Sequence, residues 1–213
     1  MRKSRSLNNL VSQSAQQGYS LFIVLMIMIV IALLVVTAVQ SYNTEQRIST
    51  NEADRKLAFS LAEAALQRGE NKIIDFENKV ITFTADCKNG QIDSEGSFDG
   101  LCITAGIKKP DKINSSIKFT GTCTNKDESE GIKCITPAWE RVEESCNDKL
   151  CIDTNGQEIK DTNVENVSKN PRYIIEYIST DTSQGSTVYR VTAKAWGKNN
   201  NTVVMLQSYV MNE

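Results

Sequence analysis

The chain has 213 residues, of which 40% are hydrophobic and 23% charged, and its net charge is −2. This length suggests one domain or one domain with an appendage, and the sequence has no basic block of the kind that nucleic-acid binders carry. It contains no histidine, which removes the commonest general base, the usual serine and cysteine triads and most catalytic zinc sites. We therefore expect no enzymatic activity, no cofactor and no metal site.

The first 40 residues divide into a basic polar segment and an uncharged apolar one. Residues 1–18 carry Arg2, Lys3 and Arg5 and no acidic residue, whereas residues 19–40 carry no charge. A helix over residues 19–40 would span about 33 Å, which is close to the hydrocarbon thickness of a bilayer. The positive-inside rule then places the N-terminus in the cytoplasm and exports the rest of the chain.

Residues 41–74 continue the helical pattern beyond the apolar segment, with no proline and with Gly69 as the only glycine. Apolar residues recur at spacings of three and four and form a stripe. The stripe consists of Leu57, Phe59, Leu61, Ala62, Ala65 and Leu66. We expect one continuous helix from residue 19 to about residue 73, with a break near Ser41–Asn43 as the alternative. The charged residues before the stripe, Asp54 among them, are expected to be solvated or to lie at subunit contacts.

Six cysteines lie after the apolar segment, and none lies before or within it. They are Cys87, Cys102, Cys123, Cys134, Cys146 and Cys151. An even number on one side of a membrane segment indicates disulfides formed in an oxidising compartment, while the absence of a C-x-x-C pair disfavours zinc. Many connectivities are possible; we expect sequence neighbours to pair, because each such pair brackets a polar turn. The expected pairs are Cys87–Cys102, Cys123–Cys134 and Cys146–Cys151.

Oxygen-bearing side chains gather shortly after the last cysteine, at Asp153, Asn155, Glu158 and Asn163. Such groups suit Ca²⁺, but the glycine of Asp153-Thr-Asn-Gly comes too early for an EF-hand loop. A turn after Cys151 is the simpler interpretation, and no metal site is predicted here.

The C-terminal region carries the clearest β pattern. Pro171–Thr180, Thr187–Gly197 and Thr202–Val210 are rich in Val, Ile, Tyr and Thr and are separated by turn residues. In the second and third of these runs apolar and polar side chains alternate, so one face of the sheet is apolar. We predict an antiparallel meander packed on the amphipathic helix, with Ala193 and Ala195 small enough to let the helix approach closely.

The junction between Gly18 and Tyr19 carries the functional prediction. A short basic leader ends in Gly18 and the apolar segment opens at Tyr19, so the polar-to-apolar boundary precedes the apolar segment, unlike in an ordinary secretory signal. This arrangement resembles the class III signal of type IV prepilins, in which a prepilin peptidase cuts after the glycine and methylates the new N-terminal residue. The resemblance implies a mature chain that begins at Tyr19 and keeps its membrane helix.

The resemblance extends over the whole chain. Residues 48–66 (ISTNEADRKLAFSLAEAAL), 171–178 (PRYIIEYI) and 189–210 (YRVTAKAWGKNNNTVVMLQSYV) look like minor pilins of the PilK/PilX type, and in particular like the K type of Neisseria-like systems. This family implies an α+β type IV pilin fold. Its parts would be a leader (1–18), a transmembrane helix (19–40), the amphipathic continuation of that helix (41–74) and an exported globular domain (75–213) with a disulfide-stapled middle.

The family also implies a location and a set of partners. Such a subunit would lie in the bacterial inner membrane with its N-terminus in the cytoplasm and its domain in the periplasm, and later in the pilus or at its tip. The implied partners are the prepilin peptidase, the inner-membrane assembly platform, the major pilin and other minor pilins, with no nucleic acid among them.

Two positions depart from the family pattern. The first mature residue is Tyr19 rather than the usual Phe, which keeps an aromatic ring there. The fifth mature position is Ile23 where a glutamate is usual, and the first acidic residue after the junction is Glu45. In major pilins that glutamate pairs with the N-terminal ammonium of a neighbouring subunit, and a buried charge without a partner is costly. We therefore expect a tip-proximal minor pilin that initiates or stabilises the fibre; a K-type pseudopilin of type II secretion and an unprocessed bitopic membrane protein are the alternatives.

Overall fold

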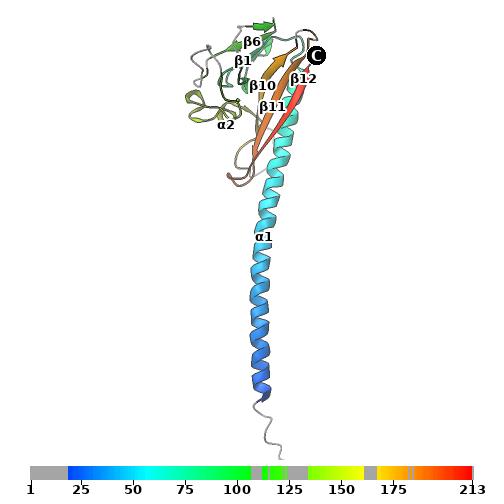
Figure 1. Ribbon diagram of the computed structural model, residues 1–213, viewed down its shortest axis with the longest axis vertical. Helices are drawn as coiled ribbons and strands as arrows, with labels where there is room; N and C mark the ends of the chain where they lie inside the picture. Colours follow the sequence, from blue (N-terminus) through cyan, green and yellow to red (C-terminus); the bar gives the residue numbers. More distant parts are fainter. Residues whose placement is uncertain are drawn as a thin grey trace, which may run out of the picture. The chain divides into compact units, whose positions relative to one another are not determined.

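The computed structural model describes residues 19–106, 112–114, 116–121, 123, 134–160, 167–181, 183 and 185–212 (Figure 1). The chain divides into two compact units, Met1–Asn51 and Glu52–Glu213. The boundary falls inside helix α1 (Tyr19–Ile74), so the described part of the first unit consists of helix alone.

Helix α1 runs without interruption, which confirms the single helix and removes the alternative of a break near Ser41–Asn43. Its burial begins only in the second unit. The buried residues are Ala58, Leu61, Ala62, Ala65, Gly69 and Ile73. Their spacings of three, four and one place them along one face, as the apolar stripe predicted. Phe59 was wrongly assigned to that stripe: it is 44% exposed, because it lies about 100° around the helix from Ala58.

The three predicted C-terminal strands are confirmed as β10 (Arg172–Thr180), β11 (Thr187–Trp196) and β12 (Val203–Asn212), which pair antiparallel in sequence order. They carry the apolar alternation that the sequence indicated, with Tyr189, Val191 and Ala193 in the core that α1 also contributes to. The meander thus packs on the second half of the helix.

The sheet does not stop at the meander, and it is mixed rather than purely antiparallel. Its order is β12-β11-β10-β4-β1-β2-β3, with β4 parallel to both β10 and β1. The chain returns through the β2–β3 hairpin before entering β4, so that β4 runs in the same sense as β1. The added strands of this path are β1 (Ile81–Thr84), β2 (Gly90–Ile92), β3 (Ser97–Phe98) and β4 (Leu101–Ile103).

Short elements complete the second unit. β5 (Lys112–Asn114) pairs with β6 (Ile117–Thr120), which lies parallel to β1, and β9 (Gln157–Glu158) pairs with β10. A separate two-stranded sheet contains β7 (Val142–Glu143) and β8 (Lys149–Leu150). The one-turn segments are the 3₁₀ helices η1 (Asp93–Glu95) and η2 (Glu144–Cys146) and the helix α2 (Cys151–Asn155).

Aromatic rings fill the core between helix and sheet. Phe83 packs against Phe119, Tyr177 and Tyr189 with ring centroids 6.1–6.2 Å apart, and Phe76, just after α1, meets the edge of Tyr189 at 5.5 Å. Edge-to-face and offset contacts of this kind add to the stabilisation from buried area. The rings therefore tie β1, β6 and the meander to the end of the helix.

Candidate assembly site

The apolar first half of α1 is the most unusual surface of the chain. Every large apolar side chain from Tyr19 to Val39 is between 42% and 72% exposed. The segment is long and apolar enough to cross a membrane. Thr37, one of its few polar residues, donates its hydroxyl to the carbonyl of Leu34 at 2.9 Å. Its hydroxyl donor is thus satisfied within the helix, as lipid requires.

One of the two predicted processing residues, Tyr19, lies at the start of this helix. Gly18 falls outside the described residues, and Tyr19 is the first residue of α1 and is 69% exposed. Ile23 lies one turn further on and is 42% exposed. The first turn of α1 contains no acidic residue, and the next carboxylate along the helix belongs to Glu45. A 26-residue stretch of exposed helix therefore offers no anionic partner for a neighbouring ammonium group.

Asp54 shows that one expectation about the helix charges was wrong. Its carboxylate accepts hydrogen bonds from the backbone N–H groups of Lys198 (2.6 Å) and Asn199 (3.3 Å), in the turn between β11 and β12. A hydrogen bond from the Thr202 side chain, joined by those from the backbone, lowers the pKa of the carboxyl group. Asp54 is half-buried, and its carboxylate caps a turn of its own chain rather than being only a solvated charge or a contact to another subunit.

Gly69 lets the helix and sheet approach closely. A Cβ atom at this position would lie 2.5 Å from Cγ1 of Val191 and 3.0 Å from Cδ2 of Tyr173, closer than side-chain atoms pack. Glycine inside a helix costs roughly 1 kcal/mol of stability relative to alanine, and the close packing explains its presence in α1. On the sheet, Ala193 and Ala195 of β11 are both fully buried, and their small side chains likewise let α1 lie close to the sheet.

The six cysteines form three disulfides, which join the sequence neighbours expected from locality: Cys87–Cys102, Cys123–Cys134 and Cys146–Cys151. Two of them pack with Ala138, Ile152 and Ile174 in a cluster of their own. Ile174 lies on β10 but outside the helix-facing core, so this cluster covers the second face of the meander.

Charged side chains on that second face are buried with partners, although alternation in the sequence indicated a polar face. The carboxylate of Glu176 accepts from the backbone N–H of Ala138 at 2.8 Å and from the guanidinium of Arg190 at 2.9 Å. Arg141 is fully buried and donates to the carbonyls of Ile103 and Thr136 at 2.7 and 3.0 Å. Burial without such partners would be costly, so these bonds hold the disulfide-rich layer in one arrangement.

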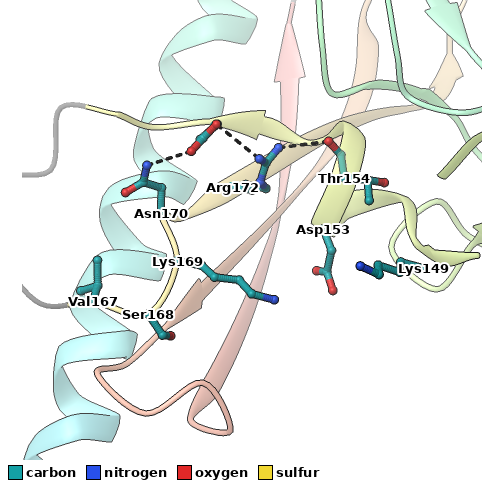
Figure 2. Close-up of a pocket in the computed structure, with 9 residues that line it drawn as sticks. Lys149, Asp153, Thr154, Val167, Ser168, Lys169, Asn170 and Arg172 are labelled. Carbon is teal, nitrogen blue, oxygen red and sulfur yellow. Dashed lines mark hydrogen bonds and ion pairs between the residues drawn. The ribbon is translucent and has the colours of Figure 1, made fainter. Parts of the chain in front are cut away.

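A polar cavity of about 480 Å³ lies beside α2 (Figure 2). Its lining residues are Lys149, Asp153, Thr154, Glu158, Val167, Ser168, Lys169, Asn170 and Arg172. Asp153 and Glu158, which were considered as Ca²⁺ ligands, bind other side chains of the protein. Asp153 binds the ammonium of Lys194 at 2.5 Å, and Glu158 accepts from Asn170 at 2.8 Å and from Arg172 at 3.3 Å.

Of the remaining two Ca²⁺ candidates, only Asn155 lies among the described residues. The Asn155 amide donates to the carbonyl of Asp86 at 2.7 Å, and Asn163 lies outside the described residues. Within the part of the chain that the structure describes, no three acidic, cysteine or histidine side chains gather as metal ligands would. The expected turn after Cys151 is in fact the short helix α2.

Two family models match the chain. The N-terminal model of PilX matches residues 17–67, and the C-terminal model of the type IV pilus assembly protein PilX matches residues 107–212. They occur in the order of the family's two halves, and the first includes the junction at Tyr19. The chain belongs to the PilX family of type IV pilus assembly proteins. No curated protein and no solved structure matches it.

Membership of this family makes the chain a membrane-anchored minor pilin that takes part in type IV pilus assembly. The α+β pilin fold and the apolar helix agree with this assignment. The family is one of pilus components and indicates a structural rather than an enzymatic role. It also favours the pilus over one of the two alternatives, a type II secretion pseudopilin.

Sequence reasoning missed Arg141 and the role of Asp54. Arg141 lies in an irregular stretch where no periodicity distinguishes a buried residue from an exposed one. The only signal for Asp54 is the composition of residues 198–201 (KNNN), a turn whose free N–H groups need an acceptor. The sequence does not indicate that this acceptor is Asp54 on α1, which lies 144 residues before Lys198.

Proposed function

We propose that this minor pilin is a tip-proximal subunit of the K type, which helps to initiate or stabilise the fibre. The observation that carries the proposal is Ile23, an exposed apolar residue where a repeating subunit has a carboxylate. After processing, the chain would present the ammonium of Tyr19 and no nearby anion.

This asymmetry limits the subunit's neighbours. The N-terminal ammonium of this chain can pair with a glutamate on a neighbouring pilin. The side chain of Ile23, in contrast, cannot pair with the N-terminal ammonium of the neighbour on the other side. An unpaired charge in lipid-like surroundings costs several kcal/mol, on the order of the penalty for an uncompensated buried ion. Such a chain is disfavoured within the fibre, where each subunit has neighbours on both sides and must pair with both. It is tolerated at the end of the fibre, where it has a neighbour on one side only.

The proposal includes the processing and topology that the sequence predicts. A prepilin peptidase would cut after Gly18 and methylate Tyr19, and the N-terminus would face the cytoplasm with the disulfide-bonded domain in the periplasm. Three disulfides in one domain support an oxidising compartment. The partners would be the prepilin peptidase, the assembly platform, the major pilin and the other minor pilins.

The test compares subunit order in assembled pili for the wild type and Ile23→Glu. Cysteine crosslinking between neighbouring subunits should place the wild type at a terminal position and allow Ile23→Glu to enter the fibre. Ile23→Val is the matched control and should behave as the wild type. If the wild type and Ile23→Glu both occupy random positions along the fibre, the tip proposal is wrong.

Processing has a separate test that does not depend on position. Mass spectrometry of the membrane-extracted protein should find an N-terminal peptide that begins with N-methyl-Tyr19. An intact Met1, or an N-terminus created by cleavage after Ala38, would contradict the prepilin interpretation while leaving the fold unchanged.

A further inference from the structure

The polar cavity beside α2 carries more positive than negative charge. Its charged lining residues are the cations Lys149, Lys169 and Arg172 and the anions Asp153 and Glu158. The volume of about 480 Å³ lies within the range of about 300–1,000 Å³ that is usual for ligand pockets. The chain as a whole has a net charge of −2, so the excess of cations is a local property of this cavity.

Both acidic side chains of the lining already have a cationic partner within the protein. A guanidinium nitrogen of Arg172 lies 3.3 Å from the carboxylate of Glu158, and the same guanidinium also donates to carbonyls in residues 154–156. The carboxylate of Asp153 lies 2.5 Å from the ammonium of Lys194, which is only 6% exposed. These two pairs are therefore neutral as units.

Lys149 and Lys169 are the cations that remain. Within the part of the chain that the structure describes, neither ammonium forms an ion pair with a carboxylate. The Lys169 ammonium lies 5.1 Å from the ring centroid of Trp196. An aromatic face attracts a cation but has no net charge, so Trp196 positions Lys169 without neutralising it. Two positive charges thus face the cavity without a described counter-ion.

The placement of these two lysines indicates what kind of anion fits. Figure 2 shows Lys149 and Lys169 extending toward Asp153 from opposite sides. A compact dianion placed between the two lysines would lie beside the carboxylate of Asp153, which repels it. Two separate anionic groups can each meet one lysine without that repulsion. Ser168 and Asn170 add neutral hydrogen-bonding groups to the lining, which suit the amides of a peptide.

From these observations we infer that the cavity binds an acidic segment of another polypeptide. Two carboxylate side chains of that segment pair with Lys149 and Lys169. Partly exposed ion pairs are individually weak and are screened by salt, so the affinity is modest and falls as the ionic strength rises. The site is separate from the Tyr19–Ile23 region and does not depend on where the subunit lies in the fibre.

The test uses the full chain in micelles of a non-ionic detergent and a capped peptide of alternating Glu and Gly as the probe. Isothermal titration calorimetry should detect binding at low salt and a loss of affinity as the ionic strength rises to about 0.5 M. A peptide with Gln in place of Glu keeps the backbone and removes the carboxylates, so it should not bind. Inorganic phosphate, a compact anion, should bind about tenfold more weakly than the Glu peptide.

Lysine variants test whether the cavity is the site. Lys149→Met and Lys169→Met should each raise the Kd up to about fivefold, the contribution of one partly exposed ion pair, and the double variant should combine the two effects. Lys88→Met/Lys118→Met removes the same charge from two exposed lysines that do not line the cavity. This control should bind the Glu peptide as the wild type does.

Trp196 provides a second readout. The chain contains two tryptophans, so Trp139→Phe leaves Trp196 as the only indole. A bound carboxylate draws the ammonium of Lys169 away from the ring, and the emission of Trp196 should therefore shift over the same peptide concentrations as the calorimetric signal. Calorimetric binding without this shift would place the peptide elsewhere on the protein and contradict the inference.

Three further outcomes would overturn it: no binding of the Glu peptide, binding that the double variant retains, and phosphate binding as tight as that of the peptide. A last variant addresses Asp161 and Glu165, which lie outside the described residues. If Asp161→Asn/Glu165→Gln binds the peptide about tenfold more tightly than the wild type, the cavity serves an acidic segment of its own chain and the inference is wrong. All these measurements use the unassembled chain, so failure here is distinguishable from failure of the tip proposal.

Discussion

The carboxylate of Asp54 on helix α1 accepts a hydrogen bond of 2.6 Å from the backbone N–H of Lys198, 144 residues later in the chain. The backbone N–H of Asn199 donates a second hydrogen bond to the same carboxylate, which therefore caps the turn between β11 and β12. Gly197 belongs to the same contact, because a Cβ there would lie 2.3 Å from the carboxylate. These contacts fix α1 to the turn between β11 and β12, one helical turn before Ala58, the first buried residue of the helix.

Replacing Asp54 should loosen this turn. In Asp54→Ala the N–H groups of Lys198 and Asn199 lose their acceptor, so their hydrogen exchange should accelerate and the urea midpoint of the second unit should fall. Glu52→Ala is the matched control, because Glu52 makes only an exposed ion pair with Lys56. Equal exchange at residues 198 and 199 in both variants would contradict the capping role.

Gly69→Ala should destabilise the second unit, although alanine is the better helix former. The added Cβ would meet Val191 and Tyr173, and overpacking of a core costs about 1–3 kcal/mol, against about 1 kcal/mol gained from helix propensity. Chemical denaturation measures the difference. Asn71→Ala, on the exposed face of α1, is the control and should be neutral or stabilising.

A second substitution identifies the cause of that loss. Val191→Ala removes the nearer of the clashing side chains, so the double variant Gly69→Ala/Val191→Ala should lose less stability than the two single variants added together. Simple additivity would mean that the glycine is needed for another reason.

The disulfides should differ in what they contribute. Cys87 and Cys102 are 15 residues apart in sequence, and Cys146 and Cys151 are five apart. Loop-closure entropy then gives about 3 kcal/mol for the first and about 2 kcal/mol for the second. Paired serine variants, compared by urea denaturation, should rank in this order. A larger loss from removing Cys146–Cys151 would show that contacts within its layer outweigh chain entropy.

Glu95 should give the second unit a dependence on acid pH. It accepts from the ammonium groups of Lys72 and Lys79, at 2.8 and 2.5 Å, and these partners lower its pKa from 4.5 to about 2. Since the folded pKa lies below the unfolded one, the stabilisation is complete above about pH 4.5 and is lost as the pH falls toward 2. The pairs are partly exposed, so the effect is small and weakens with salt.

The measurement for Glu95 is the change in urea midpoint between pH 5 and about pH 2.5. Glu95→Gln should show a smaller change than the wild type, and Glu140→Gln, an exposed residue of the same type, should match the wild type. An unaltered pH dependence in Glu95→Gln would mean that the two ion pairs do not affect folding.

Local patterns predicted the elements that are long and regular. The helix followed from the absence of proline between residues 19 and 74, and the three strands of the meander from the alternation in runs such as Thr187–Gly197. The shorter strands were beyond such reasoning: β4 has three residues, too few for a period, and lies parallel to β10 because of pairing that sequence spacing does not encode.

The candidate site divides in the same way. The cysteines are identified by their position after the apolar segment, whereas Tyr19 and Ile23 are singled out by the resemblance of the junction to the prepilin signal. Asp54, Arg141 and Glu176 were beyond reach because a charged residue is normally solvated, and only the fold brings each to its partner.

The packing of α1 on the meander has a consequence for how the protein is made. The helix residues from Ala58 to Ile73 are among the first synthesised, yet they are buried against strands that end at Asn212. Contacts this distant in sequence close slowly, and they cannot form before the last strand exists. The apolar face of the helix therefore stays partly uncovered until β12 has been synthesised. Folding of the second unit therefore cannot be completed before β12 exists, and until then the face of α1 that β12 covers is open to contacts with other chains.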